Sequence, residues 1–314
     1  MTDLIVVGSG HWGKNLVRNF EELDCLSGVV EIDATLQERM QLNHPKVPLY
    51  RSLEAALATD VTAIVLATPA PTHLELAMTA LQAGKDVFIE KPMTLRALEA
   101  RQLAEYAEAH ERILMVGHLL LYQPAIAWMR NYLRSGQAGT VRHVATHRLN
   151  LGKVRTVESV WWSLAPHDVS IVLDLLGQPE LSSVNAIGYA RLQPGIEDEV
   201  QVDLTFASGQ TAHLHCSWQW PLKQRGTIVI GDRQMLVYDE IQQTVTVHNK
   251  HIDDQLNAVD DGAQLIDIAE AQPLKLECQH FLDCIATRQH PHSDGWNGVA
   301  VVDILQRVEE VLHG

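Results

Sequence analysis

The feature that most constrains this chain is a glycine-rich turn near its start. Residues Leu4–Val7 are apolar and mostly β-branched, as in a buried parallel strand, and Gly8, Gly10 and Gly13 follow them as GxGxxG. In such a turn the first glycine permits a tight bend, the second lets backbone approach a pyrophosphate, and the third lets the next helix pack closely. That helix directs its positive end at the phosphates. The pattern therefore favours a dinucleotide site over a plain structural turn.

The second strand, predicted over residues 26–32, ends beside two acids that bear on the choice of cofactor. Glu31 and Asp33 lie about 20 residues beyond Gly13, where an acid binds the adenosine ribose hydroxyls. Carboxylates repel a 2′-phosphate, and no arginine follows immediately, so NAD is predicted over NADP. Glu31, directly at the strand end, is the better candidate for the ribose. Asp33 alternatively only caps the next helix.

The rest of the first 120 residues alternate between short apolar strands and helical segments. Strands are predicted over residues 63–67, 86–89 and 113–116, each followed or preceded by a helical pattern. Such alternation predicts a doubly wound parallel sheet of the α/β class. We therefore expect a Rossmann domain that binds NAD over residues 1–120.

After residue 120 the pattern changes to that of a largely antiparallel sheet. A strand is predicted over residues 142–151, a helix over Pro166–Leu176, and a continuous meander of strands between Glu199 and Val247. Two helices complete the chain. We expect a second α/β domain over residues 121–314, with a large open sheet and with the last helix packing back on the first domain.

Composition excludes several classes of function. The 314 residues include 24 Lys and Arg against 39 Asp and Glu, for a net charge of −15. This charge argues against nucleic acid or an anionic membrane as a partner, but permits an anionic small substrate in a local basic pocket. No apolar stretch is long enough for a membrane span, and no leader is recognised. The four cysteines form no CxxC pair and the sixteen histidines are scattered, so we expect a reduced cytoplasmic protein without a metal.

Polar groups follow several predicted strands, where a doubly wound sheet binds its ligands. Pro92 biases Lys91 away from helical geometry, which would hold an amine at the rim of the cofactor cleft. There a lysine can exchange a proton with a substrate hydroxyl or carbonyl. A solvated lysine paired with Glu90 is the alternative. The residues predicted to contact cofactor or substrate in this region are His11, Trp12, Thr68, Pro69, His73, Glu90, Lys91 and His118.

A second concentration of polar groups surrounds Pro166. Proline suits the first position of a helix, which would place His167 in the first turn. The helix dipole there lowers the pKa of a histidine and favours the neutral imidazole, which is a competent base. A capping or core histidine is the alternative, and Asp168 is interpreted as helix-stabilising.

A basic patch precedes this helix in the sequence. Arg148, Asn150 and Arg155 give an acidic chain a local site for an anionic substrate group. Solvated strand residues would account for them equally well.

Together these residues resemble the Gfo/Idh/MocA family of oxidoreductases across the whole chain. The resemblance implies a Rossmann domain, a domain with an open antiparallel sheet, and NAD(P)-linked oxidation or reduction of sugars and polyols. By matching position, Lys91 and His167 inherit the acid/base pair. The chain departs from many members at Ser163, where they have aspartate, and at Gln123, where they have asparagine. The motifs that carry the resemblance are Gly8-x-Gly10-x-x-Gly13, Ala67-Thr68-Pro69 with His73, Glu90-Lys91-Pro92, Gly117-His118 leading to Gln123-Pro124, and the helix with His167.

Within the family, residues Leu164–Ser170 are similar to members that act on nucleotide sugars for lipid A or surface-polysaccharide (lipopolysaccharide) biosynthesis. This similarity implies oxidation of the C3 hydroxyl of UDP-N-acetylglucosamine to a keto sugar, which a separate aminotransferase would then aminate. The diphosphate would lie at Arg148 and Arg155, with Trp162 and Ser163 also at the substrate.

Other readings of the resemblance stay open. The substrate could be UDP-N-acetylglucosaminuronate, inositol or a free sugar, or the chain could be a non-catalytic NAD-binding sensor. The family also implies a homodimer or homotetramer that joins through the open face of the sheet.

Overall fold

The computed structural model describes residues 2–314 as two compact units. The first runs through Leu119 and resumes at Gln272–Val302, and the second comprises Leu120–Ala271 and Asp303–Gly314. Residues 272–302 therefore lie in the first unit, whereas the sequence assigned them to the second domain. Part of the reason is the packing of α8 (Pro273–Thr287), whose Phe281 ring meets Phe88 edge-on at 5.6 Å between centroids.

The first unit contains a six-stranded parallel sheet in the order β3-β2-β1-β4-β5-β6. This order and direction confirm the predicted doubly wound fold. Four of the strands are buried throughout, as expected when helices cover both faces. The strands are β1 (Leu4–Val7), β2 (Leu26–Val30), β3 (Leu49–Tyr50), β4 (Ala63–Leu66), β5 (Asp86–Glu90) and β6 (Leu114–Gly117).

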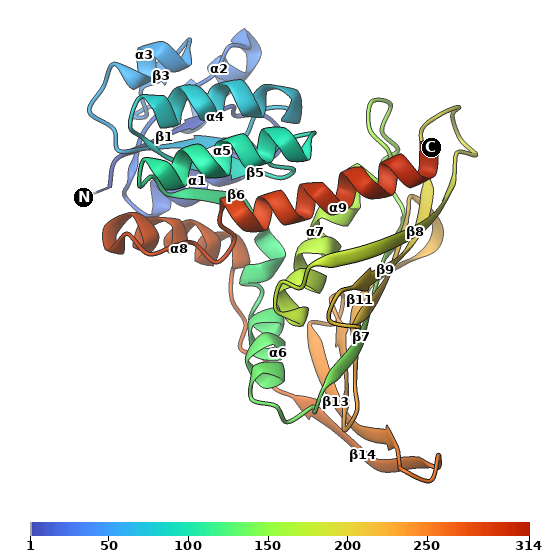
Figure 1. Ribbon diagram of the computed structural model, residues 1–314. Coiled ribbons are helices and arrows are strands. Elements are labelled where there is room, and N and C mark those ends of the chain that lie inside the picture. The colour runs from blue at the N-terminus through green and yellow to red at the C-terminus, as the bar shows by residue number, and fades with distance from the viewer. Residues whose placement is uncertain (1) are drawn as a thin grey trace. The chain divides into compact units, whose positions relative to one another are not determined.

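Helices of the first unit pack on both faces of this sheet. The pair α4 and α5 lies side by side in front of the sheet in Figure 1, whereas α8 packs against α1. Two short helices are capped by the side chain that precedes them, since Asp33 accepts from Leu36 N at 2.9 Å and Ser52 accepts from Ala55 N at 3.2 Å. The helices are α1 (Gly13–Glu22), α2 (Ala34–Asn43), α3 (Leu53–Leu57), η1 (Ala70–Thr72), α4 (His73–Gln82) and α5 (Ala97–Ala109).

The second unit is built on an eight-stranded sheet in the order β14-β13-β12-β11-β7-β10-β9-β8. Neighbouring strands are antiparallel except β7 and β10, which confirms a mainly antiparallel sheet. The strands are β7 (Val141–Leu151), β8 (Leu181–Tyr189), β9 (Glu199–Phe206), β10 (Thr211–Ser217), β11 (Gln219–Gly231), β12 (Met235–Asp239), β13 (Thr244–Ile252) and β14 (Ala258–Ile266). Strand β14 was not predicted, because most of its side chains are exposed and it has no buried face to produce an alternating pattern.

One helix of the second unit begins earlier than predicted. Helix α7 (Val160–Leu176) contains Pro166 in its interior rather than at its first turn. The apolar residues before the proline explain this, because Trp161 is fully buried and its indole donates to Leu305 O at 3.1 Å. Packing therefore compensates for the hydrogen bond that proline cannot donate. The remaining helices are η2 (Leu119–Tyr122), α6 (Pro124–Arg134) and α9 (Gly295–His313).

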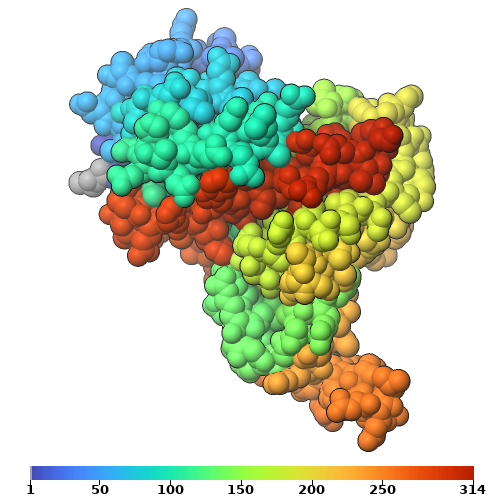
Figure 2. Space-filling model, in the orientation of Figure 1, coloured from blue at the N-terminus to red at the C-terminus, as the bar shows by residue number. Residues whose placement is uncertain are grey.

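The two faces of the eight-stranded sheet differ in character. Helix α7 packs on β7 and β10 on the side to which Val144 and Arg148 point. The opposite side carries half-buried histidines, including His147 directly beside His215 of the parallel neighbour. Figure 2 shows the β13–β14 hairpin, in orange, projecting from the rest of this unit. Among residues 2–314, no helix has the length and apolar character needed to cross a membrane.

Candidate functional site

The glycine loop of the first unit has the shape that a pyrophosphate requires. Gly8 has φ +91°, and a Cβ there would lie 2.9 Å from Ala67 O. A Cβ on Gly13 would overlap the carbonyl oxygen of Gly8, so helix α1 approaches as closely as the motif predicts. A Cβ on Gly10 would meet no atom within 4 Å. The free space is therefore at the second glycine, where the motif brings a dinucleotide against backbone.

Glu31 stands at the end of β2 as predicted, but its carboxylate already has several partners within the chain. Oε2 accepts from Ser9 N at 2.8 Å and from Ser9 Oγ at 2.7 Å, and Oε1 accepts from Ile32 N at 2.9 Å and Asp33 N at 3.0 Å. Burial alone would raise the pKa of Glu31, but these hydrogen bonds hold it below its ordinary value. Glu31 thus fixes the glycine loop and supplies a negative charge that disfavours a 2′-phosphate. A ribose hydroxyl of the cofactor would have to share the carboxylate oxygens of Glu31 with these donors.

His73 supports this site rather than lining it. Its side chain is buried, and its ring nitrogens each lie 2.9 Å from a carbonyl oxygen, those of Thr68 and Pro92. Burial lowers the pKa of His73, although the two carbonyls oppose that change. The sequence predicted a cofactor contact for His73, but the geometry instead makes it a bridge between the segments after β4 and β5. Thr68 Oγ1 accepts from Thr72 at 2.8 Å in the same segment.

The Glu90-Lys91 pair lies at the carboxyl end of β5, beside the glycine loop. Trp12 of that loop donates from its indole to Glu90, and Lys91 N donates to Glu90 Oε2 at 3.2 Å. Burial raises the pKa of Glu90 to about 7, against the hydrogen bond from Trp12 and the charge of Lys91. Lys91 is half-buried, whereas Trp12 and His11 remain more exposed. The sequence did not reveal the Trp12–Glu90 contact, which joins two segments 78 residues apart.

Two further titratable groups are buried near this pair. His118, at the end of β6, is 1% exposed, and neither ring nitrogen has a hydrogen-bond partner among residues 2–314. Burial and the charge of Lys91 lower the pKa of His118 to about 3, so its ring is neutral. Glu277 of α8 is fully buried, and burial and the charge of Glu90 raise its pKa well above the ordinary value. The sequence analysis missed Glu277, although it shares the helical spacing of the buried Cys278 and Phe281.

His167 lies in the second unit, within α7 and not at its start. The predicted effect of a helix N-terminus on His167 is therefore wrong, because two turns of helix precede it. The His167 side chain is half-buried, and Trp162 and Ser163 precede it on the same helix. Trp162 is buried at 6% exposure, whereas Ser163 is half-buried.

The predicted basic patch divides into a buried part and an exposed part. Arg148 is 3% exposed, and its guanidinium is bound by the carboxylates of Asp168 and Glu240. Those carboxylates raise the pKa of Arg148, so it stays charged. The prediction that Arg148 binds substrate is therefore withdrawn, because its donors are already occupied in the core. Arg155 is exposed in the segment after β7, with Nε 3.7 Å from Glu158 Oε1.

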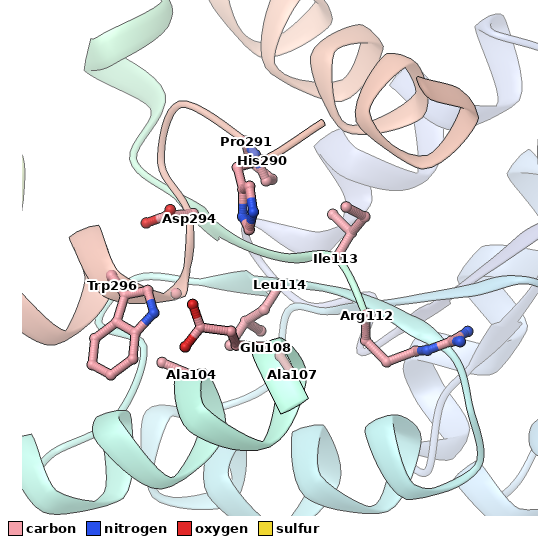
Figure 3. Close-up of a pocket in the computed structure, with 11 residues that line it drawn as sticks. Ala104, Ala107, Glu108, Arg112, Ile113, Leu114, His290, Pro291, Asp294 and Trp296 are labelled. Atoms are coloured by element: carbon pink, nitrogen blue, oxygen red, sulfur yellow. The ribbon is translucent and has the colours of Figure 1, made fainter. Parts of the chain in front are cut away.

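Figure 3 shows a pocket of the first unit. It is lined by Glu108, Arg112, Leu114, His290 and Trp296, among others, and holds about 30 Å³, roughly the space of one water molecule. Leu114 begins β6, so the pocket is at the amino ends of the parallel strands, opposite the edge with the glycine loop. Within residues 2–314, no group of three or more histidine, cysteine or acidic side chains is placed to hold a metal ion.

Comparison with known families decides what the chain is. The family model for oxidoreductases with an NAD-binding Rossmann fold, GFO_IDH_MocA, matches residues 3–118, and the model for the GFO/IDH/MocA C-terminal domain matches residues 126–237. The chain belongs to the GFO/IDH/MocA family. It is an NAD-dependent oxidoreductase, and the open space at Gly10 fits the cofactor that this family binds.

Several relatives match most of the length of this GFO/IDH/MocA protein. It is 28% identical to UDP-N-acetylglucosamine 3-dehydrogenase of Acidithiobacillus ferrooxidans over 298 residues, which is 95% of this chain and 93% of the relative. A solved structure of UDP-N-acetylglucosamine 3-dehydrogenase from that organism has a TM-score of 0.88 at 27% identity and covers 99% of this chain and 97% of its own. The scyllo-inositol 2-dehydrogenase (NAD(+)) of Bacillus subtilis is 24% identical over 74% of this chain and 69% of that relative.

Proposed function

We propose that the protein uses NAD to oxidise a hydroxyl group of a nucleotide sugar, and that this group is the C3 hydroxyl of UDP-N-acetylglucosamine. The similarity to UDP-N-acetylglucosamine 3-dehydrogenase over nearly the full length of both chains carries the proposal. The less extensive similarity to scyllo-inositol 2-dehydrogenase makes inositol the second candidate substrate.

Lys91 and His167 share the proton transfer in this proposal. NAD supplies the hydride acceptor when it is bound. Either Lys91 or His167 takes the proton of the substrate hydroxyl, and the other residue holds a hydrogen bond to the same oxygen. The carboxyl of Glu90 accepts a hydrogen bond from the backbone N of Lys91, and the neutral ring of His118 adds no competing charge. Ser163 replaces the aspartate that many family members have, so no carboxylate at that position accepts the released proton.

The proposed substrate contacts in the second unit are Asn150, Arg155, Trp162 and Ser163. Arg155 is the cation that remains for the diphosphate, since Arg148 is held in the core by Asp168 and Glu240. For the cofactor, we propose contacts from the glycine loop with His11 and Trp12, from Glu31, and from Thr68, Pro69, Glu90 and Lys91.

The wider setting follows from the same proposal. A 3-keto nucleotide sugar is a substrate for amination, so an aminotransferase would act next, in lipid A and lipopolysaccharide biosynthesis in the cytoplasm. We further propose a homodimer or homotetramer that joins through the face of the eight-stranded sheet opposite α7, where half-buried side chains such as Ile228 and Val237 lie.

A screen for NADH formation tests the function. Purified protein is mixed with NAD and separately with UDP-N-acetylglucosamine, UDP-N-acetylglucosaminuronate, scyllo-inositol and glucose, and absorbance at the NADH band is followed. We expect the first compound to have the highest kcat/KM. Faster oxidation of inositol would reassign the substrate. Tight NAD binding with no turnover of any of the four would favour a non-catalytic sensor.

A further inference from the structure

A chain of four charged side chains crosses the core of the second unit next to His167. Arg148 of β7 donates from Nε to Asp168 Oδ2 at 2.8 Å and from Nη2 to Oδ1 at 3.0 Å. The same guanidinium donates to Glu240 from Nη1 at 3.2 Å and from Nη2 at 3.0 Å. Arg225 of β11 also donates to Glu240, at 3.3 Å. Two cations and two anions therefore balance within the core.

Stability alone does not account for this network. Arg148 and Asp168 are 3% and 2% exposed, and burial of such charges costs about as much as their attraction returns. Apolar residues of the same volume often stabilise a core equally well. The paired bonds of a guanidinium to a carboxylate instead fix distance and orientation together, which a point charge or an apolar contact cannot do. The network therefore fixes the distance and orientation between the elements that it joins.

The element that it orients is the part of α7 that carries His167. Asp168 follows His167 directly, and Pro166 precedes it. Proline cannot donate the helical hydrogen bond to the residue four positions earlier, so the helix is weakened on the N-terminal side of His167. On the C-terminal side of His167, Asp168 binds the guanidinium of Arg148 on β7, and Glu240, in the segment after β12, holds the same guanidinium.

We propose that Arg148, Asp168 and Glu240 form a positioning network that fixes the height and rotation of α7 at His167 and so orients its imidazole for the reaction. The inference rests on the proposed catalytic role of His167. It assigns to Arg148 a function in catalysis that involves no contact with substrate.

The test replaces the whole network by apolar residues. Arg148→Met alone would leave two buried carboxylates without their cation, which is expected to unfold the unit. The quadruple variant Arg148→Met/Asp168→Leu/Arg225→Met/Glu240→Leu removes all four charges and nearly keeps the volume, so we expect its Tm to stay within about 5 °C of the wild type.

The same helix offers a matched control. Asp174 lies almost two turns beyond His167 on α7, and its buried Oδ2 is 3.2 Å from Nη1 of Arg130 on α6. Asp174→Asn weakens another buried ion pair of α7 without touching the network. We expect this control to lower Tm while kcat and the His167 ring position stay unchanged.

Two measurements decide the inference, and one needs no substrate. In crystal structures superposed on β7 and β10, we expect the His167 ring of the quadruple variant to be displaced by about 1 Å, and we expect kcat on UDP-N-acetylglucosamine to fall by about 10²-fold with little change in KM. A ring that superposes on the wild type, or a kcat within about two-fold of it, would overturn the inference.

Failure of the proposed function is separately visible. His167→Ala with wild-type turnover would remove the catalytic role of His167. No turnover of UDP-N-acetylglucosamine by the wild type would remove the substrate proposal. In both cases the crystallographic comparison still shows whether the network positions the ring.

Discussion

The buried carboxyl of Glu277 gives a sharp prediction about stability and pH. Its side chain is fully buried, neither carboxyl oxygen has a hydrogen-bond partner among residues 2–314, and the charged group that acts on it is the buried Glu90. Trp12 and Lys91 in turn contact Glu90. Two carboxylates so placed cannot both ionise without large cost, so Glu277 keeps its proton in the folded chain.

The sign and size of the effect follow from proton linkage. The folded pKa of Glu277 lies well above the ordinary value of 4.5, so its stabilising contribution is complete below that pH and is lost as the pH rises toward the folded pKa. While the folded chain keeps this proton and the unfolded chain loses it, each pH unit lowers the unfolding free energy by at most about 1.4 kcal/mol. Glu277→Gln keeps the shape but cannot ionise, so this part of the pH dependence should vanish.

Hydrogen exchange measures the effect in the first unit alone. The opening free energy of β5 and α8 peptides is compared at pH 5.5 and 7.5 for the wild type, for Glu277→Gln, and for Asp283→Asn as an exposed acid on the same helix. We expect the opening free energy to fall more steeply from pH 5.5 to pH 7.5 in the wild type than in Glu277→Gln, by at most about 1.4 kcal/mol per pH unit, and Asp283→Asn to follow the wild type. Identical pH dependence of Glu277→Gln and wild type would refute the reasoning.

Four other predictions concern catalysis, cofactor choice, substrate binding and assembly. Lys91→Met and His167→Ala should each lower kcat by about 10²–10⁴-fold with NAD affinity nearly unchanged. The fall in kcat of the double variant should be smaller than the product of the two single falls, which steady-state kinetics measures. Glu31→Ala should narrow the preference for NAD over NADP in calorimetric titrations, and stronger NADP binding by the wild type would contradict it. Arg155→Ala should raise KM more than it lowers kcat. Light scattering should give a mass at least twice the 35.0 kDa of one chain, and a monomer at micromolar concentration would end the assembly proposal.

The sequence was informative wherever a local pattern determined the structure. The glycine motif predicts both the conformation at Gly8 and the close approach at Gly13, because each depends on the absence of a side chain at one position. The alternation of apolar strands and helices predicts the parallel sheet because strands covered by helices on both faces are apolar along their length, as four of these strands are.

The sequence was uninformative where distant segments decide the outcome. The start of α7 depends on the burial of Trp161 against Leu305, which outweighs the ordinary preference of Pro166. In the sequence, Arg148 looks like an exposed residue that could bind a substrate. In the structure it is bound by Asp168 and Glu240, which are 20 and 92 residues away in the sequence. The local sequence does not distinguish these cases, because an arginine that is hydrated and an arginine that binds a buried carboxylate can have the same neighbours in the sequence.

The division of the chain into discontinuous units has a consequence for synthesis on the ribosome. The first unit lacks residues 272–302 until residues 120–271 of the second unit have been made, and the second unit lacks residues 303–314 until after that. Within the second unit, β7 pairs with β10 and β11, which are made 60 or more residues later. Contacts of such separation form slowly. Each unit therefore completes its native core only after residues that belong to the other unit have been made.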